Sequence, residues 1–208
     1  MKPYDIPASR RQIELVVLGS CFIATADAAP TVADARALLA EQRALRPDAT
    51  HHAHAFAVGF GASVVHGMSD DGEPAGTAGR PLLAVVNGSG LGDVCVVVTR
   101  YFGGTKLGSG GLVRAYTQAG QEVLAELPRV RKIARSDLEI RLAYNAYEPL
   151  LRLVDAAEGE VLGTDFGEDV AVRLRLATDL ADAFADAVRE LTAGRAQLRV
   201  TGEGQGAP

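Results

Sequence analysis

The sequence predicts an α+β protein of two domains, and three observations lead to this fold class. Its 208 residues suit one large or two small domains, because domains commonly contain about 100–200 residues. Hydrophobic residues make up 48% of the chain and charged residues 23%, so the chain can bury a core. Residues 133–208 also alternate between strand-like and helix-like spacing of apolar residues, in the order strand, helix, strand, strand, helix, strand.

The first 132 residues are mixed in the same way. Thr31 and Asp34 predict the start of a helix that ends before Pro47. The segment Val94–Tyr101 is apolar on both faces, as in a central strand. Together the patterns predict strands at 13–18, 21–26, 53–60 and 94–101, and helices at 31–46, 77–86 and 112–127.

In the C-terminal part, Leu138, Ile140 and Leu142 alternate with polar residues and predict the first strand. Asn145 and Thr178 are the predicted N-caps of two helices. Further strands are predicted at 161–166, 170–176 and 196–200, with a frayed tail at 202–208. This order is the split βαβ, ferredoxin-like pattern. We therefore predict domains at 1–132 and 133–208, joined by a hinge near 128–136.

The net charge of −5 argues against a general attraction to nucleic acid or anionic membrane. Residues 1–132, however, contain 13 Lys and Arg against 12 Asp and Glu, whereas the remainder contains 8 against 14. The acidity therefore belongs to the C-terminal domain. The nearly neutral N-terminal domain can still carry a local basic patch.

Several classes of protein are excluded by simpler features. No segment has the 18 or more apolar residues of a membrane span, and the N-terminus has no apolar core of signal-peptide length. The two cysteines, Cys21 and Cys95, do not make a disulfide framework. We expect a cytoplasmic protein with no membrane partner.

The first loop with unusual chemistry is Ser69–Gly79. Its three carboxylates repel one another unless they are solvated, paired with cations or bound to a metal. The loop has no Asp-x-Asp spacing of an EF-hand, and a solvated turn that ends at a helix cap, Thr77, explains it equally well. The candidate binding residues in this loop are Asp70, Asp71, Glu73 and Thr77.

The second loop is the glycine-rich segment Arg100–Gly111, which directly precedes a helix. Free N–H groups and a lysine at a helix N-terminus can bind an anion such as phosphate. The segment is neither a Walker loop nor a dinucleotide fingerprint, so a plain glycine-rich connection remains an alternative. Its candidate binding residues are Arg100, Gly103, Gly104, Lys106, Gly108 and, in the helix, Arg114.

The histidines are a weaker signal. His52 and His54 share one face of a predicted strand, and a His-x-His pair beside carboxylates can ligate zinc or iron. A packed pair at the end of the core is the simpler interpretation. We keep both as candidate binding residues and predict no metal site and no cofactor.

At the two loops the sequence resembles the YigZ/IMPACT family. The resemblance rests on the segment from Ser69 to Pro81, SDDGEPAGTAGRP, and on VTRYFGGTKLGSGGLVRAY from Val98 to Tyr116. His51-His52 and the Ser20-x-Phe-Ile-Ala segment occur in the same order as in that family. With the ferredoxin-like segment, the resemblance covers essentially the whole chain.

The resemblance implies an N-terminal βαβ domain similar to the fourth domain of elongation factor G and to a ribosomal small-subunit protein domain. It implies a C-terminal domain similar to the fifth domain of that factor. Eukaryotic members restrain a starvation-sensing kinase, and bacterial members look like ribosome- or nucleic-acid-associated regulators. Family members often have basic residues before Ser-x-Phe-Ile-Ala, whereas this chain has Val17, Leu18 and Gly19 there.

Three hypotheses follow. In the first, the protein regulates translation by binding RNA, the ribosome or a translation-associated protein through Arg100, Lys106 and Arg114. In the second, the acidic and glycine-rich loops form the active site of an enzyme acting on a small molecule or phosphate ester. In the third, Asp71 or Glu73 pairs with an arginine, Arg100 or Arg114, and the glycines serve close packing of the two loops.

Overall fold

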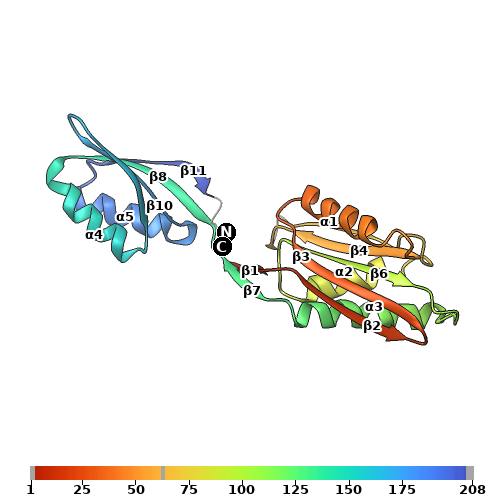
Figure 1. Cartoon of the computed structure of the whole chain (residues 1–208). Helices are drawn as coiled ribbons and strands as arrows, with labels where there is room; N and C mark the ends of the chain where they lie inside the picture. Colours follow the sequence, from red (N-terminus) through yellow and green to blue (C-terminus); the bar gives the residue numbers. More distant parts are fainter. Residues whose placement is uncertain (1–2, 62–63, 205–208) are drawn as a thin grey trace. The chain divides into compact units, whose positions relative to one another are not determined.

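The computed structural model describes residues 3–61 and 64–204 (Figure 1). The chain divides into two compact units, one of residues 4–131 and one that begins at Lys132 and also takes in Pro3. Both units combine helices with a β-sheet, which confirms the predicted fold class. No helix in the described ranges is long and apolar enough to cross a membrane.

The N-terminal unit is built on a five-stranded sheet in the order β2-β3-β6-β4-β5, in which every neighbouring pair is antiparallel. Its apolar central strand, β6, was predicted with the bounds that it has. The strands are β2 (Arg11–Val17), β3 (Ser20–Ala28), β4 (His51–Val58), β5 (Val65–Ser69) and β6 (Val94–Tyr101).

Helices cover both faces of this sheet (Figure 1). The helix α1 (Val32–Leu45) packs on the face that carries Phe56 and Val97. The opposite face is covered by α2 (Gly79–Gly88) and α3 (Gly108–Ala125), over the largest core cluster. Thr31 and Asp34, which predicted the start of this helix, form a capping box there.

The strand order brings four chain segments to one edge of the sheet. Because β3 and β4 are both antiparallel to β6, they run parallel to each other, and β5 and β6 are parallel in the same way. The N-terminal ends of β3 and β4 therefore meet the C-terminal ends of β5 and β6. The acidic loop leaves β5 and the glycine-rich loop leaves β6, so both loops begin at this edge.

These two parallel strand pairs are linked through α1 and α2, which lie on opposite faces of the sheet. A half-turn about the normal to the sheet carries the crossover from β3 to β4 onto the crossover from β5 to β6. With their helices on the same face, the two crossovers would therefore have the same hand. Because the helices lie on opposite faces, the crossovers have opposite hands. One of them is a left-handed crossover, which is rare in proteins.

Three short strands were not predicted. Residues 65–69, for which no strand was predicted, form β5. Residues 128–136, expected to be a hinge, contain β7 (Arg129–Lys132), which pairs with β1 (Tyr4–Pro7), and the start of the next strand. Segments of four or five residues have too few alternations for a pattern to be visible.

The C-terminal unit confirms the ferredoxin-like prediction. Its four strands form an antiparallel sheet in the order β11-β8-β10-β9, which is the order 4-1-3-2 along the chain. Two helices pack on its apolar core. The elements are β8 (Arg135–Leu142), α4 (Tyr147–Ala156), β9 (Glu160–Phe166), β10 (Val170–Ala177), α5 (Ala181–Leu191) and β11 (Gln197–Gly204).

The predicted caps of these helices are wrong. Asn145 and Thr178 lie in short 3₁₀ turns, 144–146 and 178–180, that precede α4 and α5, and neither side chain caps a helix. The Thr178 hydroxyl instead forms a hydrogen bond with Ser136, 2.9 Å away. The predicted tail is also partly wrong, because β11 continues to Gly204, and residues 205–208 lie outside the described residues.

Candidate functional site

The acidic and glycine-rich loops are joined by a buried ion pair. Nη1 of Arg100, near the end of β6, donates to Oε1 of Glu73 at 2.7 Å. The two side chains are only 6% and 2% exposed. The hydroxyl of Tyr116, on α3, donates to the same carboxylate oxygen at 2.7 Å. Nη2 of Arg100 donates to the hydroxyl of Ser20 at 3.3 Å, which brings the start of β3 into the network.

This network is electrostatically well paired. Burial, together with the neighbouring carboxylate of Glu73, raises the pKa of Tyr116, so its hydroxyl keeps the proton that it donates. The guanidinium of Arg100 also lies 5.4 Å from the ring centre of Phe22 and 5.7 Å from that of Phe102. Within the described residues its Nε is buried without a hydrogen-bond partner. Arg100 therefore holds the loops together from inside, rather than presenting its charge at the surface.

The glycine-rich loop lies directly on the β2–β3 turn. The backbone N–H of Gly103 donates to the Ser20 hydroxyl at 3.1 Å. A Cβ built on Gly103 would overlap the carbonyl group of Gly19 and the amide nitrogen of Ser20. Only glycine allows the two backbones to approach this closely. Close packing was expected between the acidic and glycine-rich loops, whereas Gly103 packs closely on the β2–β3 turn.

Two other glycines of this loop, Gly104 and Gly108, differ from Gly103 because backbone conformation rather than close packing favours glycine there. Gly104 and Gly108 both have positive φ, +84° and +70°, and a Cβ on either would meet no atom within 4 Å. Residues 108–111, expected in the loop, form the first turn of α3, so the loop is shorter than predicted. Lys106 is exposed, and Nη1 of Arg114 lies 3.7 Å from the Cβ position of Gly110 in that first turn.

Asp70 has a structural role at the start of α2. Its carboxylate accepts hydrogen bonds from the backbone N–H groups of Gly76, Ala78 and Gly79, at 2.8–2.9 Å. Burial by itself would raise the pKa of Asp70, but these three donors and the charge of Arg80 outweigh it and hold the pKa below its ordinary value. Asp70 thus caps the helix that Thr77 was expected to cap.

Replacing Asp70 with alanine should lower the free energy of unfolding by about 1–2 kcal/mol at pH 7, since two N–H groups at the start of α2 and that of Gly76 in the preceding loop lose their acceptor. Because the folded state lowers the pKa of Asp70, this stabilisation is present above the ordinary carboxyl pKa, about 4, and disappears as the pH falls through the lower folded value. Urea titrations between pH 7 and pH 3 measure both effects.

The control is Asp155→Ala, an exposed position on α4, which should change stability by about 0.5 kcal/mol or less. If the difference between Asp70→Ala and the parent stayed constant down to pH 3, Asp70 would not be the ionised cap described above.

Thr77 is buried and donates its hydroxyl proton to the carbonyl of Pro74 at 2.6 Å. The N-cap residue of α2 is Ala78, whose methyl side chain makes no capping hydrogen bond. The prediction that Thr77 caps this helix is wrong, because Asp70 reaches the same N–H groups from the preceding loop.

Asp71 joins the loop to β4 and α1. It has a positive φ of 49°. Its carboxylate accepts from the backbone N–H of His52 at 2.7 Å and pairs with Arg43. Burial alone would raise the pKa of Asp71. The hydrogen bond from the His52 N–H and the charge of Arg43 outweigh this effect and hold the pKa below its ordinary value. The pairing with Arg43 was not predicted, because only Arg100 and Arg114 were expected as partners of Asp71.

His51, which the sequence did not single out, belongs to the Glu73 side of the site. Its Nδ1 lies 2.7 Å from the backbone carbonyl of Asp71 and must donate, since a carbonyl oxygen only accepts. Its Nε2 lies 3.9 Å from Oε2 of Glu73. His51, Ser20 and Tyr116 complete a network of which sequence reasoning found only the ionic members.

His52 and His54 lie on the opposite face of the sheet, toward α1. The side chains of β4 alternate, and these two share the face of Phe56. Nδ1 of His52 lies 3.0 Å from the Thr99 hydroxyl, and His54 stacks on the ring of Phe56. Burial lowers the pKa of both histidines, so both are neutral at pH 7. The sheet therefore separates the two imidazoles from Glu73 and Arg100.

The candidate residues consequently fall into three groups. Glu73 and Arg100 form the buried network, Asp71 with His52 and His54 lies toward α1, and Lys106 with Arg114 is exposed beside the start of α3. In the ranges that the structure describes, no group of three or more His, Cys, Asp or Glu side chains is placed to hold a metal ion. The buried network thus forms a rigid support beneath an exposed, positively charged loop.

Comparison with known proteins matches both units. Residues 18–124 match the model of the Impact N-terminal domain, and residues 140–195 match a domain of unknown function, DUF1949. IMPACT family member YigZ of Escherichia coli (strain K12) is 34% identical over 199 residues, 95% of this chain and 98% of that protein. IMPACT family member YvyE of Bacillus subtilis (strain 168) is 32% identical over 189 residues, 89% of this chain and 85% of that protein.

A solved structure is also similar over the full length. A crystal structure described as that of a hypothetical protein has 33% sequence identity and a TM-score of 0.69, and the match covers 98% of this chain and 100% of that one. The similarity therefore extends over both units.

Proposed function

Since the chain belongs to the IMPACT family, we propose that it is a translation-linked regulatory protein that binds RNA, ribosomal RNA included, through its N-terminal unit. The observation that carries this proposal is the exposed loop 102–107 at the edge of the sheet. The loop combines a half-exposed aromatic ring, a lysine and the uncapped start of a long helix. The proposal places the protein in the cytoplasm, where RNA and ribosomes are available.

The loop has the components of a single-stranded RNA contact. Phe102 is 48% exposed, and an exposed aromatic ring can stack on a base, worth about 1–3 kcal/mol per base. Lys106 and Arg114 supply positive charge for phosphate. No acidic side chain occurs in the first turn of α3, and its N-cap makes no side-chain bond, so its N–H groups favour an anion.

The buried network supports this interpretation by restricting the loop. Gly103 is fixed to Ser20, and Arg100 to Glu73, directly beneath Phe102. A preorganised loop loses less conformational entropy on binding than a free one. The apolar residues Leu18 and Phe102 flank the Gly19–Gly103 contact, and Leu18 is 66% exposed, so this chain presents an apolar rather than a basic turn beside the loop.

The alternative of a phosphate-ester or small-molecule enzyme is less well supported. Each of the three loop carboxylates already has strong partners: Asp70 has the helix N–H groups, Asp71 has Arg43, and Glu73 has Arg100 and Tyr116. A general base must reach a substrate proton by a hydrogen bond. The three carboxylates therefore stabilise the fold and are not free to accept a proton from a substrate.

The experiment is titration of a fluorescein-labelled 12-nucleotide single-stranded RNA at 50 and 200 mM salt. Binding should weaken as salt rises, and Lys106→Ala or Arg114→Ala should reduce the slope of log K against log salt by about 0.7 per lost phosphate contact. Phe102→Leu should weaken binding without changing the slope, because it removes stacking but no charge.

The matched control is Arg152→Ala, an exposed arginine on α4 in the other unit, which should bind as the parent does. No binding at 50 mM salt, or a flat salt response, would exclude direct RNA recognition by this loop. Binding to a translation-associated protein would then be the remaining form of the proposal.

A further inference from the structure

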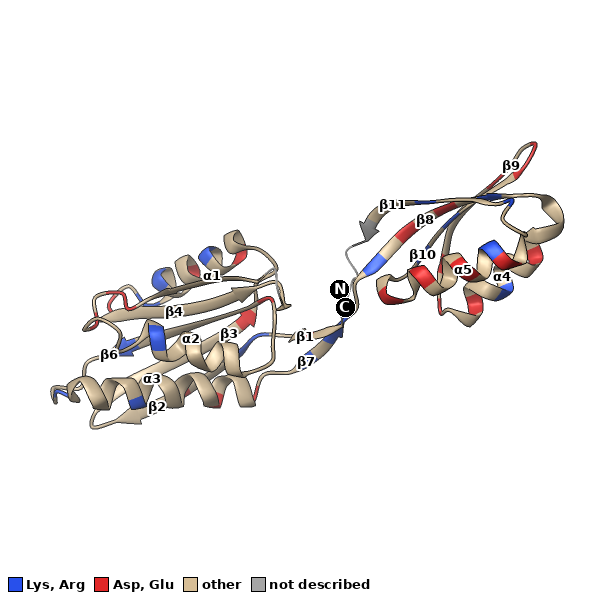
Figure 2. Ribbon diagram, turned by 180° about the vertical axis from the view of Figure 1, so that it is seen from behind, with Lys and Arg blue, Asp and Glu red and all other residues tan. Residues whose placement is uncertain are grey.

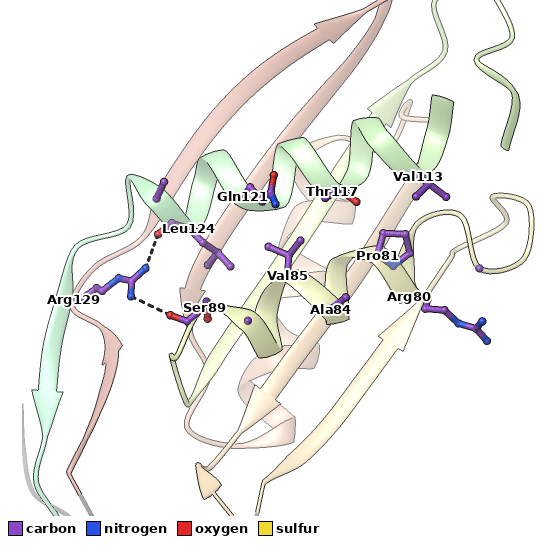
Figure 3. Close-up of a pocket in the computed structure, with 13 residues that line it drawn as sticks. Arg80, Pro81, Ala84, Val85, Ser89, Val113, Thr117, Gln121, Leu124 and Arg129 are labelled. Atoms are coloured by element: carbon purple, nitrogen blue, oxygen red, sulfur yellow. Dashed lines mark hydrogen bonds between the residues drawn. The ribbon is translucent and has the colours of Figure 1, made fainter. Parts of the chain in front are cut away.

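A groove of about 770 Å³ runs between α2 and α3 on the outer face of the N-terminal unit (Figure 3). Figure 3 shows the two helices side by side and in the same direction, with Pro81 near Val113 at one end and Ser89 near Leu124 at the other. Small or apolar side chains, among them Ala84 and Val85, line its α2 side. The groove is separate from the glycine-rich loop.

The groove exists because the helices touch at their buried side and diverge outward. Gly120 of α3 faces α2, and a Cβ there would lie 3.0 Å from a methyl carbon of Leu82 and 3.5 Å from Val85. Close approach at the base leaves the outer sides lined by short residues, of which Ala84 is exposed and Val113 is 37% exposed. Little in the described part of the chain fills the space above them.

The charge of the groove has one sign. Arg80 lies at the end where both helices begin. The carboxylate of Asp70 already accepts the N–H groups at the start of α2, so the positive charge at this end of the groove comes from Arg80. Arg129 lies at the other end and donates to the carbonyls of Ser89 and Leu124, where it neutralises the helix C-termini (Figure 3). None of the lining residues is Asp or Glu. An anionic occupant is therefore complementary.

The walls suit a helix. On α3, Val113, Thr117 and Gln121 follow at intervals of four residues, and on α2 Pro81 and Val85 do the same. Rows of side chains spaced by four form the ridges between which another helix packs, at about 8–10 Å between axes. The ten residues of α2 span about 15 Å, which matches about three turns of a guest helix.

We propose that this groove is the docking site for an acidic amphipathic helix of a partner protein. The guest places apolar side chains at i, i+3 or i+4, and i+7 over Ala84 and Val113, in the helix-in-groove mode. Its acidic residues lie at the end where Arg80 is. This surface adds a protein partner to the RNA-binding loop, and neither depends on the other.

The probe is a fluorescein-labelled synthetic helix of 14 residues with leucines at that spacing and glutamates at its other positions. Anisotropy titration with the full chain should show saturable binding, and a probe with lysines in place of the glutamates should bind at least tenfold more weakly. Ala84→Glu and Arg80→Glu should each weaken binding at least tenfold.

Two matched controls lie on α1, on the opposite face of the sheet. Ala37→Glu and Arg36→Glu replace exposed residues of the same types and should leave binding unchanged. Circular dichroism melts show whether each variant is folded. Absence of saturable binding, equal binding to Ala84→Glu and the parent, or displacement of the probe by RNA would overturn the proposal. So would self-association of the chain that Ala84→Glu abolishes, since a second copy would then be the occupant.

Discussion

Replacing Glu73 with alanine is expected to lower the free energy of unfolding by about 3–5 kcal/mol, which is typical when one partner of a buried ion pair is removed. Among the residues that the structure describes, the variant leaves the buried guanidinium of Arg100 with only the Ser20 hydroxyl as a hydrogen-bond acceptor. It also removes the acceptor of the buried Tyr116 hydroxyl. A loss of this size is a large fraction of the stability of an ordinary domain, about 5–15 kcal/mol.

Chemical denaturation followed by circular dichroism measures this change. The matched control is Glu126→Ala, which removes the partner of Arg11 from an ion pair in which both side chains are about half exposed, and should cost about 1 kcal/mol or less. A double variant, Glu73→Leu with Arg100→Met, should recover much of the loss, because no charge is left unpaired. Equal effects of Glu73→Ala and Glu126→Ala would show that the buried pair contributes little.

Replacing Gly103 with alanine is expected to have the second-largest effect. The added Cβ would overlap backbone atoms of Gly19 and Ser20, which cannot rotate away as a side chain can. We expect a loss at or above the upper end of the about 1–3 kcal/mol that overpacking costs. Moving the glycine-rich loop away from the β2–β3 turn should also weaken the proposed RNA binding, because Gly103 then loses its hydrogen bond to Ser20.

The neighbouring Gly104 is the control for this variant. Its φ of +84° costs an alanine about 1–2 kcal/mol, but no atom lies within 4 Å of its Cβ position. Gly104→Ala should therefore be the milder of the two in a denaturation experiment. If the two variants were equally stable, the close backbone contact at Gly103 would have to be abandoned.

The elements that the sequence predicts well are those with many periodic positions. Residues 94–101 form a strand buried on both faces, and α1 begins at its capping box, as expected. Short strands such as β1 and β7 leave no comparable pattern. The left-handed crossover could not be expected either, since the general preference for right-handed crossovers predicts the opposite.

For the candidate site, composition identified the two loops but not their contacts. Asp70, Glu73 and Arg100 were singled out because charges and glycines are concentrated there. That Glu73 contacts Arg100, while His52 lies across the sheet, depends on β5 lying beside β4 and on the alternation of side chains along β4. Strand order of this kind is a long-range property, which local patterns do not contain.

Charge explains why the N-terminal unit can combine binding surfaces of different kinds. Figure 2 shows basic residues on its helices and at the end of β6, with acidic residues interspersed among them. Some of these basic residues are paired with carboxylates, Arg43 with Asp71 and Arg100 with Glu73. Its overall charge near zero therefore hides positions such as Lys106 and Arg80, which are both exposed.

The buried network also has a consequence for the time course of folding. Its hydrogen bonds join residues far apart in sequence, 27 positions from Glu73 to Arg100, 43 from Glu73 to Tyr116 and 80 from Ser20 to Arg100. Closing loops of such length costs conformational entropy before the contact stabilises the chain, so we expect these contacts to form late in folding. Interactions that form after the transition state slow unfolding more than they accelerate folding. We therefore expect the buried network at this edge to slow unfolding of the sheet more than it accelerates folding.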